Sequence, residues 1–283
     1  MHYSPLRYPG GKTKLLPFIS ALIKANNLVN HEYVEPYAGG AGVALGLLLN
    51  GVVQKIHIND FDPAIYAFWQ SSVNQSEAFI AKILETPITV EEWHNQRTIY
   101  LNAANHSTLE LGFATFFLNR CNHSGIIKGR MIGGHEQKSQ WSIACRFNKE
   151  ALIKRIQRIA MLKNNIKLYN LDTKELLQKF SVIEDPLFFY LDPPYYLKGK
   201  QLYQNFYTDC DHVEIAKGLT TMPHPWLVSY DNNTRIEQIY EQYYQEKVAI
   251  NYSTGKTKIG TEIVIYSDNL SPLLNSVVGG SLI

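Results

Sequence analysis

The stretch LFFYLDPPY at residues 187–195 decides the fold of this chain. Residues 187–191 are apolar on both faces of an extended backbone, which is typical of a central strand covered by helices on each side of a sheet. Further strand-like runs occur at 33–36, 55–60, 166–169, 226–230, 247–251 and 262–266, and helical patterns occur at 14–24, 41–49 and 63–73. Because strands and helices alternate at both ends of the chain, we expect an α/β fold with a mostly parallel sheet.

The middle of the chain has a different pattern. Residues 76–159 show helical and loop character without a parallel-strand signature, and the glycine-rich, polar stretch 122–140 predicts an exposed loop or hairpin. We therefore expect an insertion at the edge of the sheet. The predicted domains are a sheet domain formed by residues 1–75 and 160–283, and an insertion formed by residues 76–159.

Charge is concentrated in one part of a nearly neutral chain. The net charge is +2, from 27 basic and 25 acidic residues, yet residues 120–158 contain nine basic and two acidic residues. That segment is therefore +7 and the rest of the chain is −5. Such a local excess predicts a face that binds a polyanion. A solvated helical surface is the alternative that charge alone leaves open.

Length and composition indicate an ordinary globular protein. The chain has 283 residues, of which 45% are hydrophobic and 18% are charged. It contains no apolar run of the roughly 18 residues that a bilayer-spanning helix needs, and residues 1–14 lack the apolar core of a signal peptide. Cys121, Cys145 and Cys210 lie far apart and are odd in number, which favours reduced thiols over a disulfide framework or a zinc site. These features predict a cytoplasmic protein.

The tetrapeptide Asp192-Pro193-Pro194-Tyr195 follows the buried strand directly. Ligands of open α/β sheets bind at the carboxyl ends of strands, so this is where a site is expected. Two prolines fix the backbone and remove two N–H donors, which leaves carbonyl oxygens beside a carboxylate and an aromatic ring. Such a cluster can accept both hydrogens of an exocyclic amine, free its delocalised lone pair and stabilise the charge that develops. A strand exit that happens to use two prolines is the alternative.

A glycine-rich turn, EPYAGGAG at residues 35–42, joins a predicted strand to a predicted helix. Glycines there let a cofactor approach the backbone closely. The spacing is not G-x-G-x-x-G, because residue 44 is alanine, and dinucleotide-dependent enzymes use such turns too. About 20 residues further on, NDFD at 59–62 ends the next strand, where an acid is suited to hydrogen-bonding ribose hydroxyls.

Two other motifs predict chemistry that the rest of the sequence does not support. Gly11-Lys12-Thr13 suggests a phosphate-binding loop, but the pattern requires a glycine at residue 6, which is leucine, and a preceding strand. His212-Val213-Glu214 matches the H-x-E of zinc deaminases, but the chain contains no P-C-x-x-C. We therefore predict neither a nucleoside triphosphatase nor a metal site.

The motifs and their order resemble the Dam-like (D12 class, α group) family of DNA adenine-N6 methyltransferases. The similarity extends over nearly the whole chain. RYPGGKTKLL (7–16) is similar to the family's N-terminal cofactor motif, VEPYAGGAGVAL (34–45) to its FxGxG loop, INDFDPAIYAFW (58–69) to its next acidic motif, and DPPY (192–195) to its catalytic motif. Asn119-Arg120 followed by Ser124-Gly125 is similar to the stretch that opens the family's recognition region.

The resemblance implies a fold and a reaction. The fold is a Rossmann-like S-adenosylmethionine-dependent methyltransferase sheet with an inserted, mainly helical DNA-recognition domain. The reaction transfers methyl from S-adenosylmethionine to N6 of an adenine flipped out of double-stranded DNA at a specific site. It also implies a bacterial or phage-encoded, cytoplasmic enzyme, with a cognate restriction endonuclease as a candidate partner.

The resemblance also implies roles for individual residues. Asp192 accepts from the target amine and Tyr195 stacks on the base, so the catalytic residues are Asp192, Pro193, Pro194 and Tyr195. The cofactor-binding residues implied are Tyr8, Lys12, Glu35, Pro36, Tyr37, Gly39, Gly40, Asp60, Asp172 and Asp192. The DNA-binding residues expected from the recognition region and its basic side chains are Arg120, Asn122, Ser124, Lys128, Arg130, Lys138 and Gln140.

Two departures from the family pattern matter. Ala41 stands where the family has glycine, and the stretch 119–141 differs from that of enzymes that recognise GATC, so GATC is not implied as the target. Three alternative functions remain open: a cytosine-N4 methyltransferase, which more often has SPPY, a methyltransferase of RNA or of a protein glutamine, and a catalytically silent DNA-binding protein.

Overall fold

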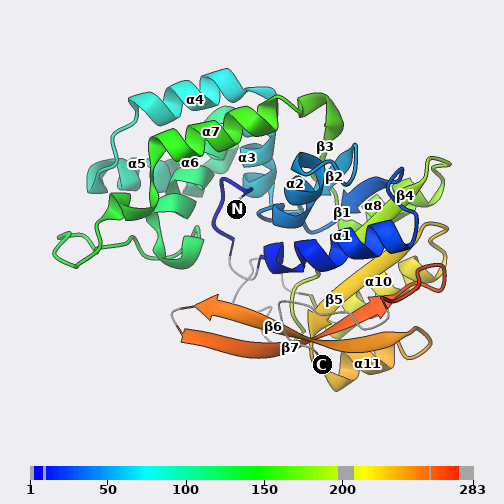
Figure 1. Ribbon diagram of the computed structural model, residues 1–283. Coiled ribbons are helices and arrows are strands. Elements are labelled where there is room, and N and C mark those ends of the chain that lie inside the picture. Colours follow the sequence, from blue (N-terminus) through cyan, green and yellow to red (C-terminus); the bar gives the residue numbers. More distant parts are fainter. Residues whose placement is uncertain (1–2, 9–10, 197–206, 255, 274–283) are drawn as a thin grey trace. The chain divides into compact units, whose positions relative to one another are not determined.

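The computed structural model describes residues 3–8, 11–196, 207–254 and 256–273, and only the backbone of 249–254 and 256–259 (Figure 1). The chain divides into two compact units. The first unit consists of Met1–Gly11 and Asp62–Asn170, and the second unit of Lys12–Phe61 and Leu171–Ile283. Within the described ranges, none of the helices combines the length and the apolar content that crossing a bilayer requires.

Seven strands form one sheet; the runs predicted from the sequence lie close to the bounds of five of them but cover only part of β6 and β7. They are β1 (Glu32–Glu35), β2 (Ile56–Asn59), β3 (Ile166–Tyr169), β4 (Leu187–Leu191), β5 (Trp226–Asp231), β6 (Gln245–Thr254) and β7 (Lys256–Tyr266). The strand order is β3-β2-β1-β4-β5-β7-β6. All five residues of β4 are buried, as the apolar run predicted for a central strand. The predicted α/β class is confirmed.

The sheet is mixed. Strand β1 pairs in parallel with β2 and β4, and β4 pairs in parallel with β5. Strand β7 is antiparallel to both β5 and β6. Thr254 at the end of β6 pairs with Lys256 at the start of β7, so the connection is too short for the crossover that parallel pairing requires. The alternating sequence predicted these two strands but not their direction.

The strand order creates a switch point in the second unit. From β1 the chain proceeds outward to β2, whereas β4 returns to the other side of β1 and continues to β5. Open α/β sheets bind ligands outside the carboxyl ends of strands at such a point, because the two connections leave in opposite directions and open a crevice. The glycine-rich turn follows β1 and DPPY follows β4, so the fold places both motifs at this point.

The helices of the second unit cover its strands (Figure 1). Their bounds are α1 (Leu16–Ala25), α2 (Gly42–Leu49), α8 (Thr173–Ser181), α10 (Asp209–Thr220) and α11 (Thr234–Ile239), and the 3-10 turn η1 (Thr13–Leu15) precedes α1. Helix α1 packs on α2, where Gly46 allows close approach to Leu16, and α8 packs on α10. Helix α10 begins with a reciprocal cap between Thr208 and Asp211, which satisfies amide groups of its first turn.

Where the structure describes it, the first unit has helices and 3-10 turns and one strand, β3. Its helices are α3 (Pro63–Asn74), α4 (Ser76–Glu85), α5 (Val90–Leu101), α6 (Thr108–Cys121) and α7 (Lys149–Ala160), with 3-10 turns η2 (Ala103–Asn105), η3 (His123–Gly125), η4 (Ile143–Arg146) and η5 (Lys163–Asn165). A buried aromatic cluster, in which Phe79 contacts Phe68, Phe113 and Phe116, forms its core. The limits 76–159 for a recognition insertion stay a prediction.

Candidate active site

The turn between β1 and α2 holds a buried carboxylate. Glu35 ends β1, is only 5% exposed and accepts a hydrogen bond from the amide of Ala44 in α2 at 3.0 Å. Burial, assisted by the nearby charge of Asp192, raises the pKa of Glu35 to about 8. Gly39 and Ala41 both have left-handed backbone, with φ of 45° and 46°. The turn therefore uses a conformation that favours glycine at a position where this chain has alanine.

The exits of β1, β2 and β3 are held together by one asparagine. The Asn59 side chain, which is 1% exposed, donates to the carbonyl oxygens of Pro36 and Leu171, and accepts from the Leu171 amide at 2.9 Å. Beside it, Asp60 accepts from the Gly39 amide at 2.8 Å. These bonds fix the glycine-rich turn against the acidic end of β2, so both predicted cofactor motifs form one edge.

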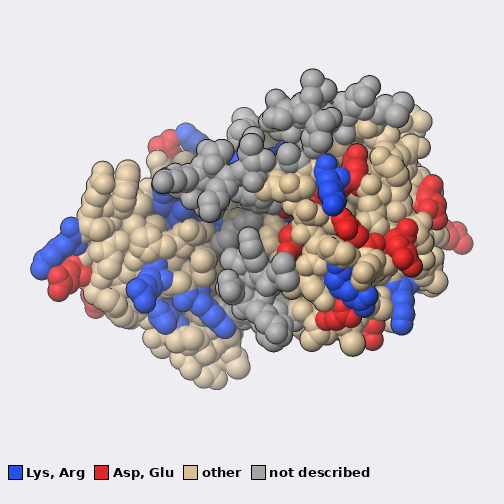
Figure 2. All heavy atoms as spheres, turned by 90° about the horizontal axis from the view of Figure 1, so that it is seen from below, with Lys and Arg blue, Asp and Glu red and all other residues tan. Residues whose placement is uncertain are grey.

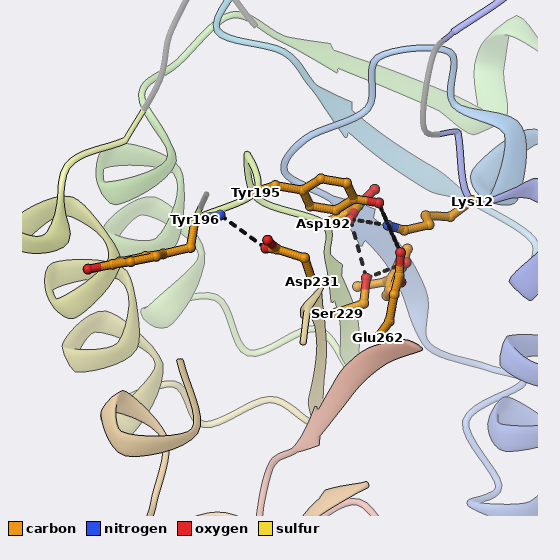
Figure 3. Close-up of polar contacts among 8 residues, drawn as sticks. Lys12, Asp192, Tyr195, Tyr196, Ser229, Asp231 and Glu262 are labelled. Atoms are coloured by element: carbon orange, nitrogen blue, oxygen red, sulfur yellow. Dashed lines mark hydrogen bonds and ion pairs between the residues drawn. The ribbon is translucent and has the colours of Figure 1, made fainter. Parts of the chain in front are cut away.

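Asp192 lies at the carboxyl end of β4 and is held from two sides (Figure 3). Lys12 Nζ lies 3.0 Å from its Oδ1, and the Ser229 hydroxyl on β5 donates to the same oxygen at 3.3 Å. Burial raises the pKa of Asp192 to about 6; the charge of Lys12 opposes this shift and that of Glu262 adds to it. At neutral pH the group is therefore a carboxylate, but a more basic one than usual.

Tyr195 joins the same network through its hydroxyl group. The hydroxyl donates to Glu262 Oε1 at 2.9 Å and accepts from Lys12 Nζ at 3.0 Å, and Lys12 Nζ also lies 2.8 Å from Glu262 Oε1. The ammonium group is 4.7 Å from the centre of the Tyr195 ring. Figure 3 shows these side chains pointing toward one another, with Lys12 between the two acids.

Tyr196 is anchored at both ends. Its amide donates to Asp231 at the end of β5 at 3.0 Å, and its hydroxyl donates to Asp209 at 2.9 Å. Arg235 binds both carboxylate oxygens of Asp209 at 2.8 and 2.9 Å. The hydrogen bonds from Arg235 and Tyr196 lower the pKa of Asp209 to about 2. The residue after DPPY is thus fixed to the sheet and to α10, which limits the movement of Tyr195.

The other predicted cofactor residues have local roles in the structure. Asp172 caps α8 by accepting from the Lys174 amide at 2.8 Å, and the Tyr37 hydroxyl donates to that of Tyr207 at 3.0 Å. Pro36 and Gly40 lie in the same turn as Gly39. Tyr8 belongs to the first unit, and Pro9 and Gly10 of its motif lie outside the described residues. Their cofactor contacts stay predictions.

Two predicted DNA-binding residues hold the first unit together. The Arg120 guanidinium donates to the carbonyl oxygens of Arg146 and Pro5, and burial, followed by the charges of Arg7 and Arg155, lowers its pKa to about 10. Asn122 is fully buried; it accepts from Trp93 Nε1 at 2.7 Å and donates to two backbone carbonyls of the following loop. Asn122 therefore supports the loop from inside, whereas Arg120 holds the backbone at Arg146 and Pro5; sequence patterns predicted neither role.

The remaining predicted DNA-binding residues are exposed. They are Ser124, Lys128, Arg130, Lys138 and Gln140. Lys138 pairs with Glu136 at 2.8 Å, and Ser124 has left-handed backbone with φ of 56°. In Figure 2, basic side chains outnumber acidic ones on the part that carries α4 to α7, and acidic ones dominate on the other part. This distribution agrees with the charge asymmetry of the sequence.

Sequence reasoning did not identify Glu262 or Ser229, and it gave Asn59 no role although Asn59 begins the NDFD motif. Glu262 lies in the apolar run EIVIY of β7, so a charged residue in a strand that is otherwise buried was the available signal. Ser229 gave no comparable signal, because a serine in a strand is ordinary. Only the strand order shows that Glu262 and Ser229 meet the motifs found from the sequence.

Comparison with known proteins identifies one family. Similar solved structures include a proposed RNA methyltransferase from Pyrococcus horikoshii, at 10% identity and TM-score 0.41, with 92% of this chain and 84% of that chain covered. Another is a precorrin-6y C5,15-methyltransferase from Geobacter metallireducens, at 10% identity and TM-score 0.37, with 88% and 86% covered. These low scores carry no weight for the substrate, and no curated protein matches the chain. The family model described as D12 class N6 adenine-specific DNA methyltransferase matches residues 8–254, and the chain therefore belongs to that family.

Proposed function

We propose that this S-adenosylmethionine-dependent enzyme takes the target adenine out of the DNA duplex and methylates it against the DPPY motif. The N6 amine is paired inside the duplex, so it must leave the stack to be reached. The observation that carries the proposal is the fixed Asp192 carboxylate, whose Oδ1 is held by Lys12 at 3.0 Å and Ser229 at 3.3 Å. An acceptor oriented before the substrate arrives stabilises developing charge without reorganisation.

In this proposal each DPPY residue has a defined task. Asp192 and the carbonyl oxygen of Pro193 accept the two N6 hydrogens, which localises the nitrogen lone pair. Pro194 keeps the backbone rigid, and Tyr195 offers its ring for stacking on the base. As the nitrogen gains a methyl group it loses one proton, and Asp192, with its pKa raised to about 6, is basic enough to hold that proton briefly.

The cofactor fits the charges at the switch point. Two acids, Asp192 and Glu262, contact one buried lysine there, and the charge of Asp192 also acts on buried Glu35, so the cluster has excess negative charge even while Glu35 holds a proton. S-adenosylmethionine supplies an electrophilic methyl group and carries a positive sulfonium and a positive ammonium. We propose that Glu35 and Asp192 face these cationic parts, that Asp60 binds the ribose, and that Asp172 lies near the adenine.

DNA recognition is assigned to the first unit in this proposal. Its exposed cations Lys128 and Arg130 would bind phosphates or read bases, whereas Arg120 and Asn122 would support the loop that presents them. The proposed substrate is therefore double-stranded DNA read at a specific sequence. A cognate restriction endonuclease, against which methylation would protect the same sequence, is the further partner we propose.

A fluorescent base tests the flipping step. Sequencing methylated DNA first identifies the target, and 2-aminopurine then replaces the target adenine in a short duplex. Flipping is expected to change its fluorescence on binding of the enzyme with a non-reactive cofactor analogue, because the base leaves the duplex stack. The same base placed two positions away should respond little. Equal responses at both positions would contradict base flipping.

A further inference from the structure

Glu262 is the least exposed charged group of the network around DPPY. It is 1% exposed, and its Oε1 lies 2.8 Å from Lys12 Nζ and 2.9 Å from the Tyr195 hydroxyl. Burying a carboxylate is costly unless charged and hydrogen-bonded partners compensate. Both partners of Glu262 belong to sequence motifs at the switch point, one N-terminal and one in DPPY. An apolar residue in β7 would avoid this cost, so the contact has a use beyond packing.

The contacts of Glu262 fix two side chains at once, Lys12 and Tyr195. Lys12 Nζ lies between Glu262 and Asp192, at 2.8 and 3.0 Å, so its position is fixed by two acids rather than one. The Tyr195 hydroxyl both donates to Glu262 and accepts from Lys12, so swinging the side chain about its Cα–Cβ bond would break two charge-assisted bonds. Stacking on a base uses only the aromatic ring, but the ring must be held in a defined position.

We propose that Glu262 is a positioning residue for methyl transfer, which fixes Lys12 beside Asp192 and locks the Tyr195 ring as a preformed stacking surface. This inference rests on the proposed function, in which Tyr195 stacks on the flipped adenine. The Tyr195 hydroxyl then acts as an anchor, and the ring acts on the base. Glu262 touches neither base nor cofactor in this account and acts through its two partners.

The charges around Asp192 give the proposal a second consequence. The titratable groups near Asp192 are Lys12, Tyr195, Glu262 on β7, Tyr190 on β4, and Tyr33 and Glu35 on β1. Among them the charge of Glu262 raises the pKa of Asp192, and that of Lys12 lowers it. Replacing Glu262 by glutamine keeps the shape of the side chain but removes one negative charge. Asp192 is then the only carboxylate of this network that pairs with Lys12. The acid limb of the pH–rate profile should then move to lower pH.

A double-mutant cycle tests the proposal. The variants are Glu262→Gln, Tyr195→Phe and the two combined, compared by single-turnover methylation of the mapped DNA site. We expect Glu262→Gln to slow methyl transfer by at least about tenfold, because a charge-assisted anchor is lost. Tyr195→Phe should slow it less, and adding Tyr195→Phe to Glu262→Gln should change the rate by less than about twofold, because the hydroxyl would already have lost its charged acceptor.

A matched control lies in the same hairpin. Glu246 on β6 accepts from the Tyr266 hydroxyl, so Glu246→Gln breaks another glutamate–tyrosine pair without touching the network of Lys12. It should keep the wild-type rate and pH profile. Thermal melting of all variants identifies any that fail to fold, and Glu262→Asp, which keeps the charge, should recover part of the rate.

The outcomes separate the two proposals. Wild-type methylation with a 2-aminopurine response at the target base establishes the proposed function before any variant is compared. Given that result, two outcomes would overturn the positioning role. One is a Glu262→Gln variant that transfers methyl as fast as the wild type. The other is a combined variant whose rate loss equals the product of the two single losses, with an unchanged pH–rate profile. A sub-multiplicative combined loss with a shifted acid limb supports it. Absence of the wild-type response would instead overturn the proposed function.

Discussion

Asp192 is the residue on which the proposed chemistry depends most. Its carboxylate form accepts from the N6 amine more strongly than the neutral acid and can also take up the proton that the amine loses, and its pKa of about 6 means that the neutral acid dominates below that pH. We therefore expect the single-turnover rate to fall tenfold per pH unit below about 6, and to level off above it.

The matching substitution is Asp192→Asn, which keeps the shape but turns one acceptor into a donor. It should reduce kcat by at least about 100-fold, the usual effect of losing one preorganised transition-state contact. The measurement is methyl transfer from labelled cofactor, with circular dichroism as the check that the fold is intact. Near-normal turnover of Asp192→Asn would show that another group accepts from the amine.

Glu35 leads to a prediction about cofactor binding. Its pKa is raised to about 8, chiefly by burial, so at pH 7 it holds a proton. A cationic ligand favours the carboxylate and lowers that pKa, so binding should release a proton and become tighter as the pH rises toward 8. Calorimetry of S-adenosylmethionine binding at pH 7 in two buffers of different ionisation enthalpy measures the release. Glu35→Gln should abolish it, and a wild-type value of zero would place Glu35 away from the cofactor's positive charge.

At the scale of elements, the close packing of α3 and α6 depends on Gly112. A Cβ built on Gly112 would lie 2.4 Å from the carbonyl oxygen of Ala67 and 2.7 Å from Ser71 Oγ. Since helix backbones cannot yield easily, Gly112→Ala should lower the free energy of unfolding by about 1–3 kcal/mol, despite the higher helix propensity of alanine.

Gly218→Ala in α10 is the control for that prediction. Its Cβ would meet only the flexible end of Leu177 at 3.3 Å, so propensity should dominate and stability should stay level or rise. Urea unfolding of both variants, with unchanged m-values, gives the comparison. If the two variants were equally stable, α3 and α6 would pack less closely than they do in the structure.

The elements also show how far sequence reasoning reaches. The bounds of β4 follow from five apolar residues and agree with the structure, because a strand buried on both faces has an unmistakable composition. The antiparallel direction of β7 does not follow from its own residues, since alternation reports exposure and not the partner strand. Glu262 shows the same limit for the site: the motifs identified Asp192 and Lys12, but the partner that β7 brings to them depends on tertiary pairing.

At the scale of the whole molecule, charge is divided between binding and structure. The segment 120–158 has a net charge of +7, but the Arg120 guanidinium donates its hydrogen bonds to backbone carbonyls of its own unit. Lys128 and Arg130 are exposed, and we propose that they contact the DNA. Replacing both by alanine should weaken DNA binding and reduce the slope of log K against log salt by up to about 2, because each phosphate contact releases counterions.

Two basic residues outside the proposed DNA contacts serve as controls: one in an exposed ion pair and one that bonds to the backbone. Lys174→Ala, at an exposed ion pair with Glu214 in the second unit, should leave the salt slope unchanged. Arg120→Ala should lower thermal stability, because its carbonyl partners lose their donor. Binding by fluorescence anisotropy between 50 and 200 mM salt provides the slopes. If Lys174→Ala reduced the salt slope as much as the double substitution of Lys128 and Arg130, the DNA would bind elsewhere on the protein.

The most direct test of the account is transfer of tritium from labelled S-adenosylmethionine into unmethylated bacterial DNA, followed by nucleoside analysis. We expect label in N6-methyladenine alone, at a defined sequence, and loss of that label in Asp192→Asn. Label in N4-methylcytosine, or no label in any nucleoside while the cofactor still binds, would contradict it.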